Sequence, residues 1–471
     1  MSFFKNGNYE IYSVAFIFCI KYSKVCYINS NQAVFWKGED VMIEIIEKKV
    51  NKGGITFHFI PNKKFKTVNI VLKCKSPLDR STITKRALLR YVLEQGTKQY
   101  PTEKALMLKL DELYGAVLTL ASMKKGNEHI LHFQMEVANQ RFIENESTIM
   151  EEALHLFHEI IFEPNRDATG FNDQIVTREK ETLKSKIESI YDDKVSFANQ
   201  RLIDHMCKDE KFSIHTNGYE EDLNSINGEN LSTYYDTVLA SDEMDLYVLG
   251  DIDVEEIETQ VTNVFTRPNH HKQEILSADD VRTRSDVQDI VETQAIQQAK
   301  LHLGYRTNCT YKDEDYAALQ VFNGLYGGFP NSKLFLNVRE KHSLAYYAAS
   351  RIESHKGLLL VFSGIEPTDY EKAKTIIDDQ FALMQAGNFT EQEVEETKEL
   401  IVSELKETLD SPYGIIELLY QQVVGDKPLS PKTLIEKIGQ ISKPDVEAIA
   451  KKIELDTVYL LTKEQGGDVH G

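Results

Sequence analysis

Residues 327–347 read GGFPNSKLFLNVREKHSLAYY, and this stretch decides the fold. Its opening glycines and proline interrupt any preceding helix. From Ser332 onward the apolar residues follow a 3.6-residue spacing, which predicts an amphipathic helix capped by Asn331 or Ser332. Arg339 lies near the end of that helix, and Tyr346 begins a predicted strand seven residues later. The Arg339 guanidinium and the Tyr346 phenol are therefore expected to point toward the same region.

This segment resembles the C-terminal half of the insulinase (pitrilysin) family of inverted-motif zinc metallopeptidases. In that family a glycine-rich turn leads into a helix ending Leu-Arg-Glu-Lys, followed by Gly/Ser-Leu-Ala-Tyr. Arg339 and Tyr346 match in identity and spacing. The resemblance implies that they bind a substrate peptide and stabilise a tetrahedral oxyanion. In isolation, the two residues have a second interpretation, in which Arg339 forms a surface ion pair and Tyr346 packs in the core.

Length and composition limit the class of protein. A chain of 471 residues predicts two or more domains, and 41% hydrophobic content is enough to bury their cores. The formal net charge of -20 makes nucleic acid an unexpected partner. The five cysteines form no C-x-x-C pair and no even disulfide framework, which predicts a cytoplasmic protein.

The first forty residues carry an apolar run at 11–20. No small-residue cleavage site follows this run, so it does not read as a signal peptide. It is also shorter than the ~20 apolar residues that a membrane helix needs, and no membrane association is expected. Lys37 to Asp40 have codons typical of a ribosome-binding site, and Met42 follows closely. We therefore expect residues 1–41 to be a disordered leader, with translation normally beginning at Met42.

The pattern of the remaining sequence predicts two copies of one domain. A first domain at 42–266 and a second at 294–471 show the same order of strands and helices, separated by a polar linker at 267–293. The strand at 67–75, which alternates like a half-buried strand, recurs at 299–305. The family resemblance adds the fold class: α+β, with two homologous halves, each an antiparallel sheet backed by helices, arranged as a clamshell.

The family's zinc motif, H-x-x-E-H, belongs on the first helix of the N-terminal half. Two histidines at i and i+4 share one helix face and bind the metal, while the glutamate activates water. The alignment places Ala87, Arg90 and Tyr91 at these three positions. Alanine offers no ligand, tyrosine is a poor zinc ligand near neutral pH, and arginine puts a permanent positive charge beside a cation. No metal is therefore expected in this chain.

Other candidate ligands are weaker. Glu181 and Glu188 have the seven-residue spacing of the family's further acidic pair, but the Lys/Glu-rich helix favours a solvated face. His129 and His132 point to opposite faces of a strand. His302 is expected to face away from the apolar side of its strand, partly exposed. The last pair of candidates, His270 and His271, lies in the predicted linker.

Together these features predict a zinc-free subunit of a heterodimeric metallopeptidase. A homologous partner with an intact H-x-x-E-H would hold the zinc, and this chain would supply Arg339 and Tyr346 to bind peptide substrates. Two alternatives remain open. The chain could be a non-catalytic scaffold or peptide-binding subunit, or it could be an active zinc peptidase with relocated ligands.

Overall fold

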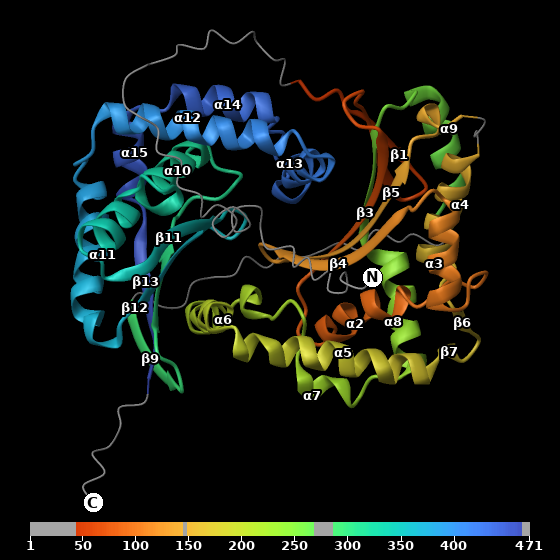
Figure 1. The fold of residues 1–471 in the computed structure, drawn as a ribbon, viewed down its shortest axis with the longest axis horizontal. Coiled ribbons are helices and arrows are strands. Elements are labelled where there is room, and N and C mark those ends of the chain that lie inside the picture. Colours follow the sequence, from red (N-terminus) through yellow and green to blue (C-terminus); the bar gives the residue numbers. More distant parts are fainter. Residues whose placement is uncertain (1–43, 145–147, 268–285, 464–471) are drawn as a thin grey trace, which may run out of the picture. The chain divides into compact units, whose positions relative to one another are not determined.

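The computed structural model describes residues 44–144, 148–267 and 286–463, which hold two β-sheets and their covering helices (Figure 1). The expected leader at 1–41 lies outside the described residues, as do positions 268–285 of the expected linker. The end of that linker is not a loop, because Gln288–Gln294 forms strand β9. Short polar strands at a sheet edge alternate too weakly to be recognised from apolar spacing.

The first sheet has six strands in the order β1-β2-β8-β3-β5-β4. Their bounds are Lys48–Lys52 (β1), Ile55–Pro61 (β2), Thr67–Pro77 (β3), Val117–Lys125 (β4), Glu128–Ala138 (β5) and Glu243–Gly250 (β8). All neighbours are antiparallel except β2 and β8. β1 and β2 form a hairpin in which Gly53 and Gly54 both adopt positive φ, as a two-residue type I′ turn requires.

The second sheet repeats five of these strands in the same spatial order. Its strands are Gln288–Gln294 (β9), Ala299–Arg306 (β10), Ala345–Glu353 (β11), Leu358–Ile365 (β12) and Glu454–Lys463 (β13). The order β9-β13-β10-β12-β11 matches β2-β8-β3-β5-β4, including one parallel pair in the same place. The internal duplication predicted from the sequence is thus visible in the topology, and β9 takes the position of β2.

Helices cover the sheets in a matching order. The first half contains Ile83–Leu93 (α2), Glu103–Glu112 (α3), Ile149–Phe162 (α4), Asp173–Asp192 (α5), Lys194–Met206 (α6), Glu220–Leu223 (α7), Gly228–Ser241 (α8) and Val254–Val264 (α9). The two-stranded ribbon of Arg166–Asp167 (β6) and Gly170–Phe171 (β7) lies between α4 and α5. Short 3-10 turns are formed by Gln140–Phe142, Lys211–Ser213 and Pro367–Asp369.

The described part of the second half contains six α-helices and two π-helical turns. The α-helices are Tyr316–Asn323 (α10), Tyr370–Gln385 (α11), Glu391–Thr408 (α12), Pro412–Gly425 (α13), Pro431–Gln440 (α14) and Lys443–Ala450 (α15). The π-helical turns are Gly324–Gly328 and Phe335–Lys341. No helix in the described part of the chain is long and apolar enough to cross a membrane. The predicted α+β class, with mainly antiparallel sheets and helices, is confirmed.

Each sheet is covered on its second face by a helix from the other half. Apolar residues of α13 in the second half pack on Ile60, Val71 and Tyr247 of the first sheet. In return, α6 of the first half packs on Leu360 and Phe362 of the second sheet. The two halves therefore complete one another's cores, and the described residues from Glu44 onward form one compact unit.

This exchange corrects two expectations. Strand β3 was predicted to be half-buried, but it is buried on both faces, and Lys73 on its second face is 0% exposed. His302 on β10 was predicted to be partly exposed and is also 0% exposed. The alternation of a strand reports only whether its residues are apolar, and it does not reveal a helix that comes from a distant part of the sequence.

Candidate functional site

The helix that carries Arg339 is held by two buried apolar residues. Ser332 caps it, since its hydroxyl accepts a hydrogen bond from the Phe335 N–H at 3.4 Å. Leu334 and Val338 are fully buried and fix the helix against the second sheet's core. The segment winds as a π-helix, although the spacing predicted an α-helix. Two buried residues one turn apart fit both windings, so the sequence alone does not distinguish them.

A tight connection leads from Arg339 to Tyr346. Ser343 has a φ of 51°, and its N–H donates to the Arg339 carbonyl at 3.0 Å. The Leu344 N–H donates to the Val338 carbonyl, also at 3.0 Å. These bonds close the helix in the way that a left-handed residue usually does. Both ends of the connection are therefore fixed by the backbone.

Strand β11 begins with an irregularity at Tyr346. Ala345 pairs with Ile365 and Tyr347 pairs with Gly364, so Tyr346 has no partner of its own in the ladder. A β-bulge of this kind redirects the side chain of the extra residue. The Tyr346 side chain is accordingly 79% exposed, whereas Ala345 and Tyr347 on either side are buried or half-buried.

The structure agrees with half of the second interpretation: Arg339 forms a surface ion pair with Glu340, but Tyr346 lies outside the core. Tyr346 does not pack in the core, and the Arg339 side chain is 43% exposed. Arg339 lies over the Phe335 ring, 4.6 Å from its centroid, and 3.6 Å from the Glu340 carboxylate. Neither side chain hydrogen-bonds the other, but both are presented to solvent from one short connection.

The three positions of the lost zinc motif lie on α2 as predicted. Ala87 is 0% exposed and packs in the core between α2 and the first sheet. Arg90 stacks on the neighbouring Tyr91 ring, with its guanidinium carbon 4.3 Å from the centroid, and donates a hydrogen bond to the Tyr91 hydroxyl. At the positions where the family resemblance places the metal ligands, this chain therefore has a buried methyl group and a guanidinium. These residues do not fit zinc, and we derive no reaction step through a metal in this chain.

The residue that caps the C-terminus of α2, Glu94, is a half-buried acid that the sequence did not single out. Burial raises the pKa of Glu94 to about 7, although Arg90 and a hydrogen bond from the Leu120 backbone oppose the shift. Leu120 belongs to β4, an edge strand of the first sheet. Glu94 therefore links the degenerate motif to that free edge.

Helix α5 presents a different carboxylate to α2 from the two weighed in the sequence. Glu181 and Glu188 are both exposed, which confirms the expected solvated face. Glu179 is buried instead, hydrogen-bonded to Arg178 at 2.7 Å, and its charge is felt by Glu94. Its spacing from Val176 and Leu183 places it on the apolar face of α5, and this spacing could have identified it.

The histidines considered as ligands do not converge on a metal. His129 accepts a hydrogen bond from the buried Arg86 at 2.9 Å, and burial lowers the pKa of His132 to about 3. His302 faces Phe362 beneath α6, and burial likewise lowers its pKa to about 3. Across residues 44–144, 148–267 and 286–463, no group of three His, Cys, Asp or Glu side chains could hold a metal ion. His270 and His271 lie outside these ranges.

The duplicated α+β fold and the Arg339–Tyr346 connection define a metallopeptidase-like protein, and its described residues group no set of metal ligands. A family profile described as "Peptidase M16 inactive domain" matches residues 225–401. "Probable inactive metalloprotease YmfF" of Bacillus subtilis (strain 168) is 40% identical over 425 residues, which cover 90% of this chain and 100% of that protein. The chain belongs to the peptidase M16 (insulinase) family and is an inactive metalloprotease homologue within it.

Solved structures show the same relationship. A conserved protein from Enterococcus faecalis V583 is 33% identical, with a TM-score of 0.81 over 90% of this chain and 100% of its own. A protease from Helicobacter pylori is 14% identical, with a TM-score of 0.75 over 89% of this chain and 99% of its own. The second likeness concerns the fold alone.

Proposed function

We propose that this protein is the zinc-free subunit of a paired M16 peptidase that processes peptides. In this proposal a homologous partner carries an intact H-x-x-E-H with its zinc, and this chain contributes Arg339 and Tyr346 to the shared site. We further propose a cytoplasmic location, which suits the free thiols of Cys74, Cys207 and Cys309.

One observation carries the proposal: Tyr346 is 79% exposed at a bulge, while its connection is fixed by two backbone hydrogen bonds and by the buried Val338 and Leu344. A large aromatic side chain held in solvent by a rigid backbone has no packing role in the isolated chain. Tyrosine and arginine are also the residues most often enriched where proteins bind partners tightly. The pair is thus arranged to contact something outside this chain.

The chemistry of the two side chains fits a peptide at its reacting carbonyl. The Tyr346 hydroxyl would donate a hydrogen bond to the oxyanion that develops on that carbon, which is the charge that donors of this type stabilise. The Arg339 guanidinium would bind a carbonyl or carboxylate of the same peptide and fix its position. The attacking water and its activation would belong to the partner.

The two alternatives predict different behaviour. A scaffold or peptide-binding subunit would need neither side chain for turnover. This alternative therefore gives no reason for the exposure of Tyr346. An active peptidase with relocated ligands would need a ligand cluster, and the described residues offer none. Metal analysis of the isolated chain separates this last alternative from the others.

Co-purification followed by a peptidase assay tests the proposal. A chain of similar size with an intact H-x-x-E-H should accompany this protein, and the pair should cleave peptides that neither chain cleaves alone. Stoichiometric zinc and peptide cleavage in the isolated chain would contradict it. Failure of any homologous chain to bind would also contradict it.

A further inference from the structure

The two sheets differ at one edge. In the first sheet, β1 pairs with β2 in an antiparallel hairpin and covers its outer side. In the second sheet, β9 takes the place of β2 and pairs with β13 (Figure 1). Among the described residues, no strand pairs with the other side of β9. The duplicated fold therefore accommodates an antiparallel strand at a position that the second sheet leaves open.

The backbone of β9 can accept a further strand at this edge. Parallel pairing with β13 uses the N–H and C=O groups on one side of β9, and the groups on the other side point outward. A strand that adds to such an edge forms main-chain hydrogen bonds along its length. β9 has seven residues, which is enough for a ladder of ordinary length.

The side chains of β9 alternate between the two faces of the sheet. Ile290 packs with the apolar cluster beneath α6, and Glu292 points to the same helix. Val291, between them, points to the opposite face and is 59% exposed. Val287, just before the strand, is 48% exposed. Two exposed valines therefore lie along the open edge.

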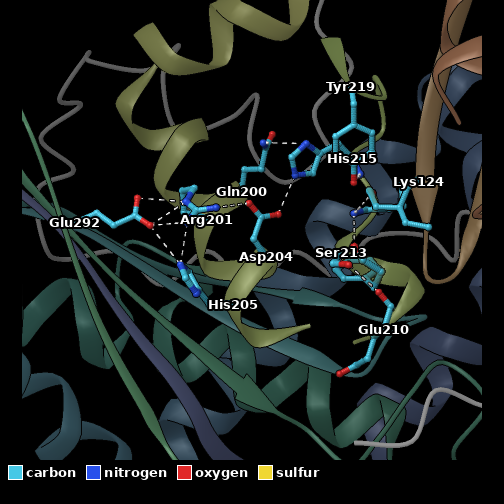
Figure 2. A network of polar contacts seen from close by, with 12 residues as sticks. Lys124, Gln200, Arg201, Asp204, His205, Glu210, Ser213, His215, Tyr219 and Glu292 are labelled. Atoms are coloured by element: carbon cyan, nitrogen blue, oxygen red, sulfur yellow. Dashed lines mark hydrogen bonds and ion pairs between the residues drawn. The ribbon is translucent and has the colours of Figure 1, made fainter. Parts of the chain in front are cut away.

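β9 lacks the usual devices that keep edge strands apart. It contains no lysine, arginine or proline. Figure 2 shows the Glu292 carboxylate turned toward Arg201 of α6, at distances down to 2.6 Å, and the Tyr459 hydroxyl also donates to it at 3.0 Å. Burial lowers the pKa of Lys374 on α11, but nearby acids that include Asp289 raise it. Both acids of β9 thus have a cation of their own chain nearby.

A second copy of β9 matches this edge in an antiparallel register centred on Val291. The two Val291 side chains then lie opposite each other, Asp289 lies opposite Thr293, and Ile290 lies opposite Glu292. Apolar contact and charge both favour this register, because like charges directly opposite are destabilising. Centring the pair on Asp289 or on Glu292 would place two carboxylates together, and centring it on Ile290 would place Val291 against Asp289.

We propose that β9 is a contact between two copies of this chain, which join edge to edge around a two-fold axis at Val291. The second sheets of the two copies then form one continuous sheet, with five strands from each copy. The same surface is used on both sides, so the assembly closes as a dimer. Tyr346 is on β11, at the opposite edge of the sheet, so this contact is separate from the site in the peptidase proposal.

Sedimentation velocity of the full chain tests the dimer. The unaltered protein should sediment with twice the 54.0 kDa mass of one chain. Val291→Lys should raise the dissociation constant about tenfold or more, because it places two lysines opposite each other. Val117→Lys is the matched control, since Val117 is 56% exposed on β4, an edge strand of the first sheet, and its replacement should leave the mass unchanged. A monomer at every concentration, or equal behaviour of the two variants, would overturn the proposal.

Cysteine cross-linking tests the register. Val291→Cys should form a disulfide between two copies under a mild oxidant, because residues directly opposite have Cα atoms about 4.5 to 5.5 Å apart. Asp289→Cys should not link to itself, since its two copies are displaced by about 13 Å along the strands. A mixture of Asp289→Cys and Thr293→Cys chains should link. Mass spectrometry of the linked peptides distinguishes these disulfides from any that involve native cysteines. Equally fast linking of Asp289→Cys and Val291→Cys chains would contradict the register.

Discussion

Helix α2 lies in the first half of the duplicated fold, and the connection from Arg339 to Tyr346 lies in the second. Their side chains differ in exposure to solvent. On α2 the former ligand positions are absorbed into the structure: Ala87 is in the core, and Arg90 and Tyr91 stack on each other. On the connection, Tyr346 is held in solvent by a bulge. The α2 positions are thus part of the packing of the first half, whereas the Tyr346 side chain contributes nothing to the core of the second half.

The largest expected effect concerns Tyr346. Tyr346→Phe should lower turnover by the reconstituted pair about 100-fold, because one oxyanion donor is worth about 2.7 to 4 kcal/mol. The free energy of unfolding should change by less than about 0.5 kcal/mol, since the side chain is exposed. A peptidase assay and denaturant unfolding measure the two quantities.

Tyr347→Phe provides the matched control for that prediction. The neighbouring Tyr347 is half-buried, and it packs with the residues beneath α6. Its replacement should leave turnover unchanged. Equal losses in the two variants would mean that the hydroxyl of Tyr346 has no specific role.

The second effect concerns the opposite half. Ala87→His should destabilise the protein by about 1 to 3 kcal/mol, because it forces an imidazole into a close-packed core. No zinc should be bound, and chemical unfolding with metal analysis tests both points. Ala382→His on the exposed face of α11 is the control and should cost less than about 0.5 kcal/mol. Tight zinc binding by Ala87→His would show that the position is still a functional site.

A third prediction concerns the acid next to the lost motif. Because the pKa of Glu94 is raised to about 7 in the folded protein, the folded state binds a proton more tightly than the unfolded state. The free energy of unfolding should therefore fall as pH rises from about 4.5 to 7. Glu94→Gln should remove this fall and stabilise the protein at pH 8 by about 1 to 2 kcal/mol. Equal pH profiles of unfolding for both proteins would refute the assignment.

The smallest effect concerns His58 on β2. Burial lowers the pKa of His58, but hydrogen bonds to Asp245 at 3.0 Å and Glu47 at 2.6 Å outweigh burial and raise it. The charged imidazole stabilises the fold fully below its unfolded pKa, and this contribution is lost as pH rises through the folded pKa. The slope is limited to about 1.4 kcal/mol per pH unit for one proton. Thermal unfolding of His58→Gln across pH 5 to 9 should lack this slope.

Much of the site could be predicted because its residues are close in sequence. Arg339 and Tyr346 are joined by a short connection, so their identity and spacing were sufficient to place them. The bulge at Tyr346 was not predictable, since it depends on the pairing of β11 with β12. Glu179 was missed because a single charged residue on the apolar face of a helix does not by itself indicate that its side chain is buried.

The sequence by itself determined the family and the duplication, because motifs and the order of strands and helices can be read from the order of residues. The tertiary structure decided that both faces of each sheet are buried, the second by a helix of the opposite half. Lys73 and His302 lie on strands whose own half leaves them open, and α13 and α6 of the opposite half cover them. Burial of this kind arises from contacts between distant segments, and periodicity within one segment carries no information about the segment that will cover it.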